Sequence, residues 1–154
     1  MTDTVDLPPA MREVADDFAE LTANERLQLL LEFSEGLPEL PERYAGSLDS
    51  MEQVHECQSP IFLAVEVDDE PADRPGDRAV HLFFSAPPEA PTTRGFAGIL
   101  HEGLDGLTVA EVLAVPEAAP YQFSLGEAVS PLRLRGMVGM LSRIKRQVAL
   151  KSQS

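Results

Sequence analysis

Apolar and polar residues alternate along the chain in three regimes: helical spacing at both ends and strand-like spacing in the middle. Apolar residues at three- and four-residue steps predict an amphipathic helix over about residues 9–20. A second helix follows, with either Thr22 or Asn24 as its N-cap, and ends at Gly36. Prolines come directly after it, so residues 38–52 are predicted to be mostly loop.

The middle of the chain predicts strands. Residues 61–67 place apolar side chains at every second position, and residues 79–85 form a similar run. Between them lies the acidic, turn-rich segment 68–77, which predicts an antiparallel hairpin. Residues 52–55 are predicted to add a short third strand.

Helical patterns return after a proline-rich connection and continue to the end of the chain. We expect one helix capped by Thr92 or Thr93, one opened by Thr108 in a capping-box sequence, and a last one over 131–149 capped by Ser130. Strands flanked by runs of helices, without regular alternation, predict an α+β fold. In it, a small antiparallel sheet of about three strands carries helices packed on one face.

Length and composition fit one domain. The chain has 154 residues, 44% of them apolar, which is enough to bury a core without metal or disulfide support. We therefore expect a single domain over 1–154, with 1–9 and 150–154 flexible. No apolar run approaches the roughly 20 residues that span a membrane, and no signal-peptide pattern opens the chain. A cytoplasmic protein without a membrane partner is the expectation.

Charge is distributed unevenly. All 26 acidic residues lie at or before Glu127, while six of the 12 basic residues follow it, so the first 127 residues carry −20 and the remainder +6. A basic end of this kind sometimes binds nucleic acid. Here the acidic body would repel phosphates over about a Debye length, and no aromatic or glycine-rich pattern accompanies the basic residues. We therefore expect no nucleic-acid partner and a cationic last helix lying on the acidic body.

The most reactive group is the single cysteine, Cys57. One thiol cannot close an intrachain disulfide, complete a four-thiolate zinc site or hold an iron–sulfur cluster. A buried, inert cysteine is one interpretation, because free cysteine usually behaves as a small hydrophobe. The polar neighbours His55, Glu56, Gln58 and Ser59 favour another, a loop that leads into a strand and carries a candidate nucleophile.

Other chemistry finds little support. His55 is either a local base or hydrogen-bond donor for the thiol or an ordinary loop residue, and Glu56 opposes the positive surroundings that lower a thiol pKa. The histidines form no helical pair of the zinc-binding kind. No phosphate loop, nucleophile elbow or dinucleotide fingerprint is present, so neither a metal nor a bound cofactor is predicted.

Several segments carry a resemblance when their order and spacing are taken together. They are Leu-Leu-Leu-Glu-Phe-Ser at 29–34, Leu-Pro-Glu-Leu-Pro at 37–41, Cys-Gln-Ser at 57–59, Arg-Gly-Phe-Ala-Gly-Ile-Leu at 94–100 and Ser-Pro-Leu-Arg-Leu-Arg-Gly-Met at 130–137. Over nearly its whole length the chain thus resembles the SufE family, the sulfur acceptors of bacterial iron–sulfur cluster assembly. The resemblance implies a SufE/IscU-like α+β fold.

By this resemblance Cys57 matches the cysteine that accepts sulfur as a persulfide, and Arg133 matches the arginine of a Ser-Pro-Ser-Arg motif. Two positions depart from the family pattern: Glu56 replaces a glycine and Leu132 replaces a serine. Arg133 either stabilises the thiolate or persulfide anion or is a surface residue paired with an acidic side chain. An apolar wall that includes Phe62 is expected to shield the persulfide.

The resemblance implies an accessory protein rather than a stand-alone enzyme. It would take sulfane sulfur from a SufS-like cysteine desulfurase, stimulate that enzyme and pass the sulfur to an iron–sulfur scaffold complex. Pyridoxal phosphate would belong to the desulfurase. The chain would act as a monomer or a homodimer. Two other classes stay open: a non-catalytic protein-binding module with a structural cysteine, and a thiol peroxidase-like or reductase enzyme, against which the lack of a second cysteine argues.

Overall fold

A computed structural model describes residues 7–126 and 128–153, so most of the expected flexible leader, residues 1–6, lies outside the described residues, as does residue 154. The elements are α1 (Pro9–Ala19), α2 (Ala23–Glu35), α3 (Glu42–Ala45), β1 (Glu52–Gln53), β2 (Phe62–Val67), β3 (Val80–Ser85), α4 (Pro91–Leu104), α5 (Val109–Leu113) and α6 (Pro131–Lys151). Single 3₁₀ turns lie at Leu48–Ser50 and Pro75–Asp77, and a longer one at Ala119–Phe123. This is the predicted α+β class.

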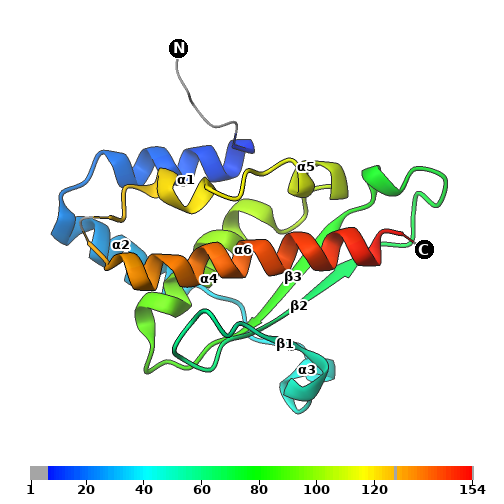
Figure 1. Ribbon diagram of the computed structural model, residues 1–154, viewed down its shortest axis with the longest axis horizontal. Helices are drawn as coiled ribbons and strands as arrows, with labels where there is room; N and C mark the ends of the chain where they lie inside the picture. The colour runs from blue at the N-terminus through cyan, green and yellow to red at the C-terminus, as the bar shows by residue number, and fades with distance from the viewer. Residues whose placement is uncertain (1–6, 127, 154) are drawn as a thin grey trace.

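The sheet has three antiparallel strands in the order β1-β2-β3. Leu63 of β2 lies opposite Phe84 of β3 on one side and Glu52 of β1 on the other. The hairpin and the short third strand are therefore confirmed, although β1 is only two residues long. Figure 1 shows α6 running the length of the molecule beside these strands, with α3 on their other side.

The predicted capping residues explain where three helices begin. Thr22, not Asn24, caps α2: its hydroxyl accepts the Glu25 N–H at 3.3 Å, and the Glu25 carboxylate accepts the Thr22 N–H at 2.9 Å. Thr108 forms the same capping box at α5. Ser130 caps α6 by accepting a backbone N–H at 3.3 Å.

Two helix boundaries differ from prediction. Neither Thr92 nor Thr93 caps α4, because the helix already begins at Pro91, whose fixed φ and missing N–H suit a first helical position. The last helix continues to Lys151, two residues beyond its predicted end and into the segment expected to be flexible. Lys151 helps to hold it there, since its ammonium donates to the Val65 carbonyl at 2.5 Å.

The segment predicted as mostly loop, residues 38–52, contains the short helix α3 and a 3₁₀ turn. Four helical residues are too few to show a periodic apolar pattern, so the sequence carries no signal for them. Tyr44 of α3 packs on Phe83, with ring centroids 5.2 Å apart, on the sheet face opposite α6. The long helices cover one face as predicted, and α3 covers part of the other.

Helix α4 lies at the centre of the molecule and packs against α1, α2, α6 and β3. Two glycines on α4 allow a close approach to α2: a Cβ at Gly95 would lie 2.6 Å from the Leu30 carbonyl oxygen, and one at Gly98 would lie 2.3 Å from that of Phe33. The core contains the fully buried side chains of Met11, Phe18, Phe96, Phe123, Ile99, Leu100, Met137 and Ile144. Within the described residues, no helix is both long and apolar enough to cross a membrane.

Candidate functional site

The loop between β1 and β2 carries Cys57 and is closed by backbone hydrogen bonds. The Val54 N–H donates to the Ile61 carbonyl at 2.8 Å, and the Cys57 N–H donates to the Val54 carbonyl at 3.2 Å. Val54 and Ile61 are both fully buried, so each end of the loop is anchored in the core. The polar residues between them consequently form a compact loop at the end of the sheet, as their sequence predicted.

Helix α6 supplies the surface on which this thiol rests. A Cβ placed on Gly136 would lie 2.9 Å from the Cys57 Sγ, closer than real Cβ atoms approach other atoms. Glycine at this position therefore leaves room for the sulfur against the helix backbone, and a larger residue would displace it. Cys57 is half-buried, with its side chain packed on the edge of the core.

A small pocket of about 80 Å³ opens beside the thiol. Its lining residues are Glu56, Cys57, Gln58, Ser59, Thr93, Leu132 and Arg133. The structure thus brings Arg133 of α6 together with four residues of the loop, which sequence reasoning had connected only through the resemblance. His55 is exposed and does not line the pocket.

The expected apolar wall differs in composition from the prediction. Phe62 does not line the pocket, because neighbouring residues in a strand point to opposite faces and Leu63 takes the position that faces the core. The apolar side comes instead from Leu132, a residue that is 52% exposed. Shielding of the thiol therefore depends on the fit between loop and helix.

Burial dominates the electrostatics of the thiol. Desolvation, and after it the negative charge of Glu56, raise the pKa of Cys57 from an ordinary 9.0 to about 12, although Arg143 partly opposes them. The sequence prediction that Glu56 disfavours the thiolate is confirmed in direction. At neutral pH the resting thiol is protonated, and a protonated thiol is a poor nucleophile.

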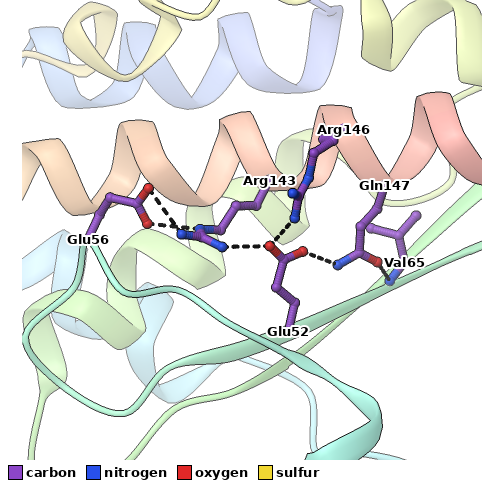
Figure 2. Close-up of polar contacts among 6 residues, drawn as sticks. All are labelled: Glu52, Glu56, Val65, Arg143, Arg146 and Gln147. Atoms are coloured by element: carbon purple, nitrogen blue, oxygen red, sulfur yellow. Dashed lines mark hydrogen bonds and ion pairs between the residues drawn. The ribbon is translucent and has the colours of Figure 1, made fainter.

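The Glu56 side chain, which is 42% exposed, reaches toward α6 and forms an ion pair with Arg143 (Figure 2). The Arg143 Nε donates to one Glu56 carboxylate oxygen at 2.8 Å, and Nη2 donates to the other at 3.3 Å. These hydrogen bonds lower the pKa of Glu56 against the opposing effect of its partial burial. Glu56 is therefore ionised at neutral pH and fixes the loop to the helix.

Glu52 connects the same arginine to the sheet. Its carboxylate accepts from Arg143 Nη1 at 2.6 Å, from Gln147 Nε2 at 2.8 Å and from Arg146. The Gln147 side-chain oxygen in turn accepts the Val65 N–H at 3.0 Å. Desolvation would raise the pKa of Glu52, but the hydrogen bonds from these three side chains outweigh it and lower the pKa. The predicted cationic helix on an acidic body is confirmed by these contacts.

Arg133 lies on the first turn of α6, exposed, with its backbone N–H bonded to the cap of the helix. It makes no ion pair with any other described residue. Among the described residues, Arg133 is therefore a surface arginine without an acidic partner. Among the described residues, 7–126 and 128–153, no three His, Cys, Asp or Glu side chains lie close enough together to hold a metal ion.

Sequence reasoning missed Thr93, Arg143 and Gly139 as neighbours of the thiol loop. Thr93 was predicted only as one of two alternative helix caps, and it instead lines the pocket from α4. Arg143 was indistinguishable from the other basic residues of the last helix. The glycine pair did carry a signal: two glycines three residues apart inside a helix, Gly136 and Gly139, mark a face that other atoms approach closely.

Fold and site together define a small α+β protein with one half-buried thiol, held in a tight loop between two strands and against the first half of its last helix. The family model for SufE, described as an Fe-S metabolism associated domain, matches residues 12–148. The chain belongs to the SufE family.

Relatives cover nearly the whole chain. Two Mycobacterium tuberculosis proteins, from strains CDC 1551 and H37Rv, are each 51% identical over 148 residues, which is 96% of this chain and 97% of theirs; both are named as uncharacterized SufE-like proteins. The solution structure of a hypothetical protein from Thermus thermophilus aligns with a TM-score of 0.80 and 36% identity, covering 97% of this chain and all of that one. The fold is therefore shared with a solved structure.

Proposed function

We propose that this protein is a sulfur carrier of iron–sulfur cluster assembly: Cys57 accepts sulfane sulfur from the persulfide of a cysteine desulfurase and passes it to a cluster scaffold. Membership of a family associated with Fe-S metabolism supports this role. The observation that carries the proposal is the placement of Cys57 in a small pocket lined by Arg133, at the N-terminal end of a long helix. Burial and Glu56 keep the resting thiol protonated, so we expect the Arg133 guanidinium to act on the sulfur anion that forms during transfer.

The transfer is a thiol–persulfide exchange. The Cys57 thiolate attacks the outer sulfur of the partner's cysteine persulfide, one sulfur–sulfur bond forms as another breaks, and the partner's thiolate leaves. The proton lost by the Cys57 thiol balances the one taken up by the departing thiolate, so no oxidant or reductant is consumed. The product is a persulfide on Cys57.

The pocket is large enough for the transferred sulfur atom. A space of about 80 Å³ is well above the roughly 10–15 Å³ that a cavity needs to hold one water, so it has room for one added sulfur atom. Because Cys57 is half-buried against α6, we expect it to move outward when it exchanges sulfur with a partner. After exchange, the persulfide can return to the pocket, away from small thiols and oxidants.

Intact-mass analysis tests the proposal. The protein is incubated with a SufS-like cysteine desulfurase and cysteine, and we expect a gain of one sulfur atom that a thiol reductant reverses. The Cys57→Ser variant, checked by circular dichroism to be folded, should show none. Absence of the gain in wild type, with the desulfurase bound, would replace the carrier role with that of a binding module whose thiol is idle, an alternative that the raised pKa of Cys57 favours.

A matched pair of variants tests Arg133. Arg133→Gln removes the guanidinium that lines the pocket, whereas Arg135→Gln removes an exposed one from the same helix that does not line it. We expect slower sulfur uptake only in the first variant, because only there does the persulfide anion lose a nearby cation. Equal rates of sulfur uptake in both variants would show that the Arg133 guanidinium has no role in the transfer.

A further inference from the structure

We propose that Glu56 is a positioning residue for Cys57: its carboxylate, seated over Gly139 and held by Arg143, clamps the thiol loop onto α6 and sets how accessible the thiol is at rest. The clamp is a property of the isolated chain. Only its consequence for sulfur uptake rests on the proposed function.

The seat for Glu56 is built into the helix. A Cβ placed on Gly139 would lie 2.7 Å from both Cγ and Cδ of Glu56, so any larger residue there would displace the side chain. Gly136, three residues earlier and hence on the same helix face, makes the equivalent space for the Cys57 sulfur. Two consecutive loop side chains thus fit two successive openings along one turn of α6.

The ion pair is anchored more firmly than an ordinary surface pair. Arg143 holds Glu56 through two nitrogens, and the Arg143 side chain is only 21% exposed. A third nitrogen of the same guanidinium donates to Glu52 of β1, which also accepts from Gln147 (Figure 2). The arginine is therefore already oriented before it meets Glu56, and less side-chain entropy is lost when the pair forms.

The ion pair between Glu56 and Arg143 lowers the reactivity of Cys57 through two effects. Because the two residues are adjacent, the pair on α6 fixes the backbone from which the thiol projects. The ionised carboxylate also disfavours a thiolate beside it. Breaking the pair should therefore make the thiol more reactive, both by opening the loop and by removing an opposing charge.

The test is the rate at which Cys57 reacts with iodoacetamide at pH 8, followed by intact mass on the full chain. Glu56→Gln removes the ion pair, and Gly139→Ala keeps every charge but fills the seat. We expect each to raise the rate about three- to tenfold, the range between an exposed pair and a charge-assisted bidentate one. The matched control is Glu66→Gln, which breaks the bidentate pair with Arg43 at 2.8 Å on the other face of the sheet and should leave the rate unchanged.

A double-mutant comparison separates the clamp from general loosening. In a Glu56→Gly background the seat is empty, so adding Gly139→Ala should have no further effect on alkylation. Unchanged rates in both Glu56→Gln and Gly139→Ala would overturn the proposal, and so would an equal rise in the Glu66→Gln control.

The desulfurase assay shows the consequence for the carrier. Glu56→Gln should take up sulfur faster than wild type and lose it faster to added glutathione, since the same clamp limits both steps. If wild type takes up no sulfur, the proposed function fails, while the alkylation rates still decide whether the clamp exists.

Discussion

The strongest quantitative prediction concerns the pH dependence of Cys57 reactivity. Burial raises its pKa from 9.0 to about 12, which leaves on the order of a thousandfold fewer thiolates near pH 8 than an ordinary cysteine has. Each thiolate of higher pKa is a better nucleophile, by about 15- to 30-fold for a Brønsted coefficient of about 0.4–0.5. The folded protein should therefore react about 30- to 60-fold more slowly than an unperturbed thiol.

The assay is reaction with a neutral dipyridyl disulfide, followed by absorbance from pH 7 to pH 10. In the folded chain the rate should rise about tenfold per pH unit without levelling off, because the thiol stays far below its pKa throughout. The same chain unfolded in urea provides the control, and its curve should level off near pH 9. A plateau near pH 9 in the folded protein, or equal folded and unfolded rates at pH 8, would refute the argument that the thiol is desolvated.

Three further predictions concern stability, measured by urea unfolding. Because the pKa of the Cys57 thiol is raised on folding, its contribution to stability is complete below pH 9 and is lost as the pH rises toward 12. Between pH 8 and 10 the free energy of unfolding should therefore fall by up to about 1 kcal/mol more in wild type than in Cys57→Ala; parallel curves would contradict this. Gly98→Ala should destabilise by about 1–3 kcal/mol, because its Cβ would lie 2.3 Å from the Phe33 carbonyl oxygen, whereas Gly46→Ala, with nothing within 4 Å, should change stability by under about 0.5 kcal/mol. Thr108→Ala should cost about 1 kcal/mol by opening the α5 capping box, and an unchanged unfolding midpoint would count against that role.

Much of the fold can be predicted from residues that are close together in the sequence. The capping box at Thr108 and the cap at Ser130 needed only residues a few positions apart, and the structure confirms both. For α2 the sequence left Thr22 and Asn24 as alternatives, and the structure shows Thr22. The hairpin follows from two apolar strands around a turn-rich segment. Where two local signals competed, as with Pro91 against the threonines after it, the sequence alone did not decide the start of the helix.

The thiol loop shows where local information ends. Cys57 and its polar neighbours are contiguous, so the sequence identified them as one candidate site, and the resemblance added Arg133. The clamp is different: Glu56 and Arg143 are 87 residues apart, and nothing in the chain marks them as partners.

By itself, the sequence determined the fold class, the caps at Thr108 and Ser130, the hairpin and the one reactive residue, because each depends on neighbours in the chain. Only the tertiary structure decided how reactive that residue is at rest. The pKa of Cys57 depends on burial against α6, and that burial depends on Gly136 and Gly139 leaving room for the loop to approach. Desolvation and close packing are set by atoms brought together from distant parts of the chain, and the glycine pair marks a face of close approach without showing which atoms approach it.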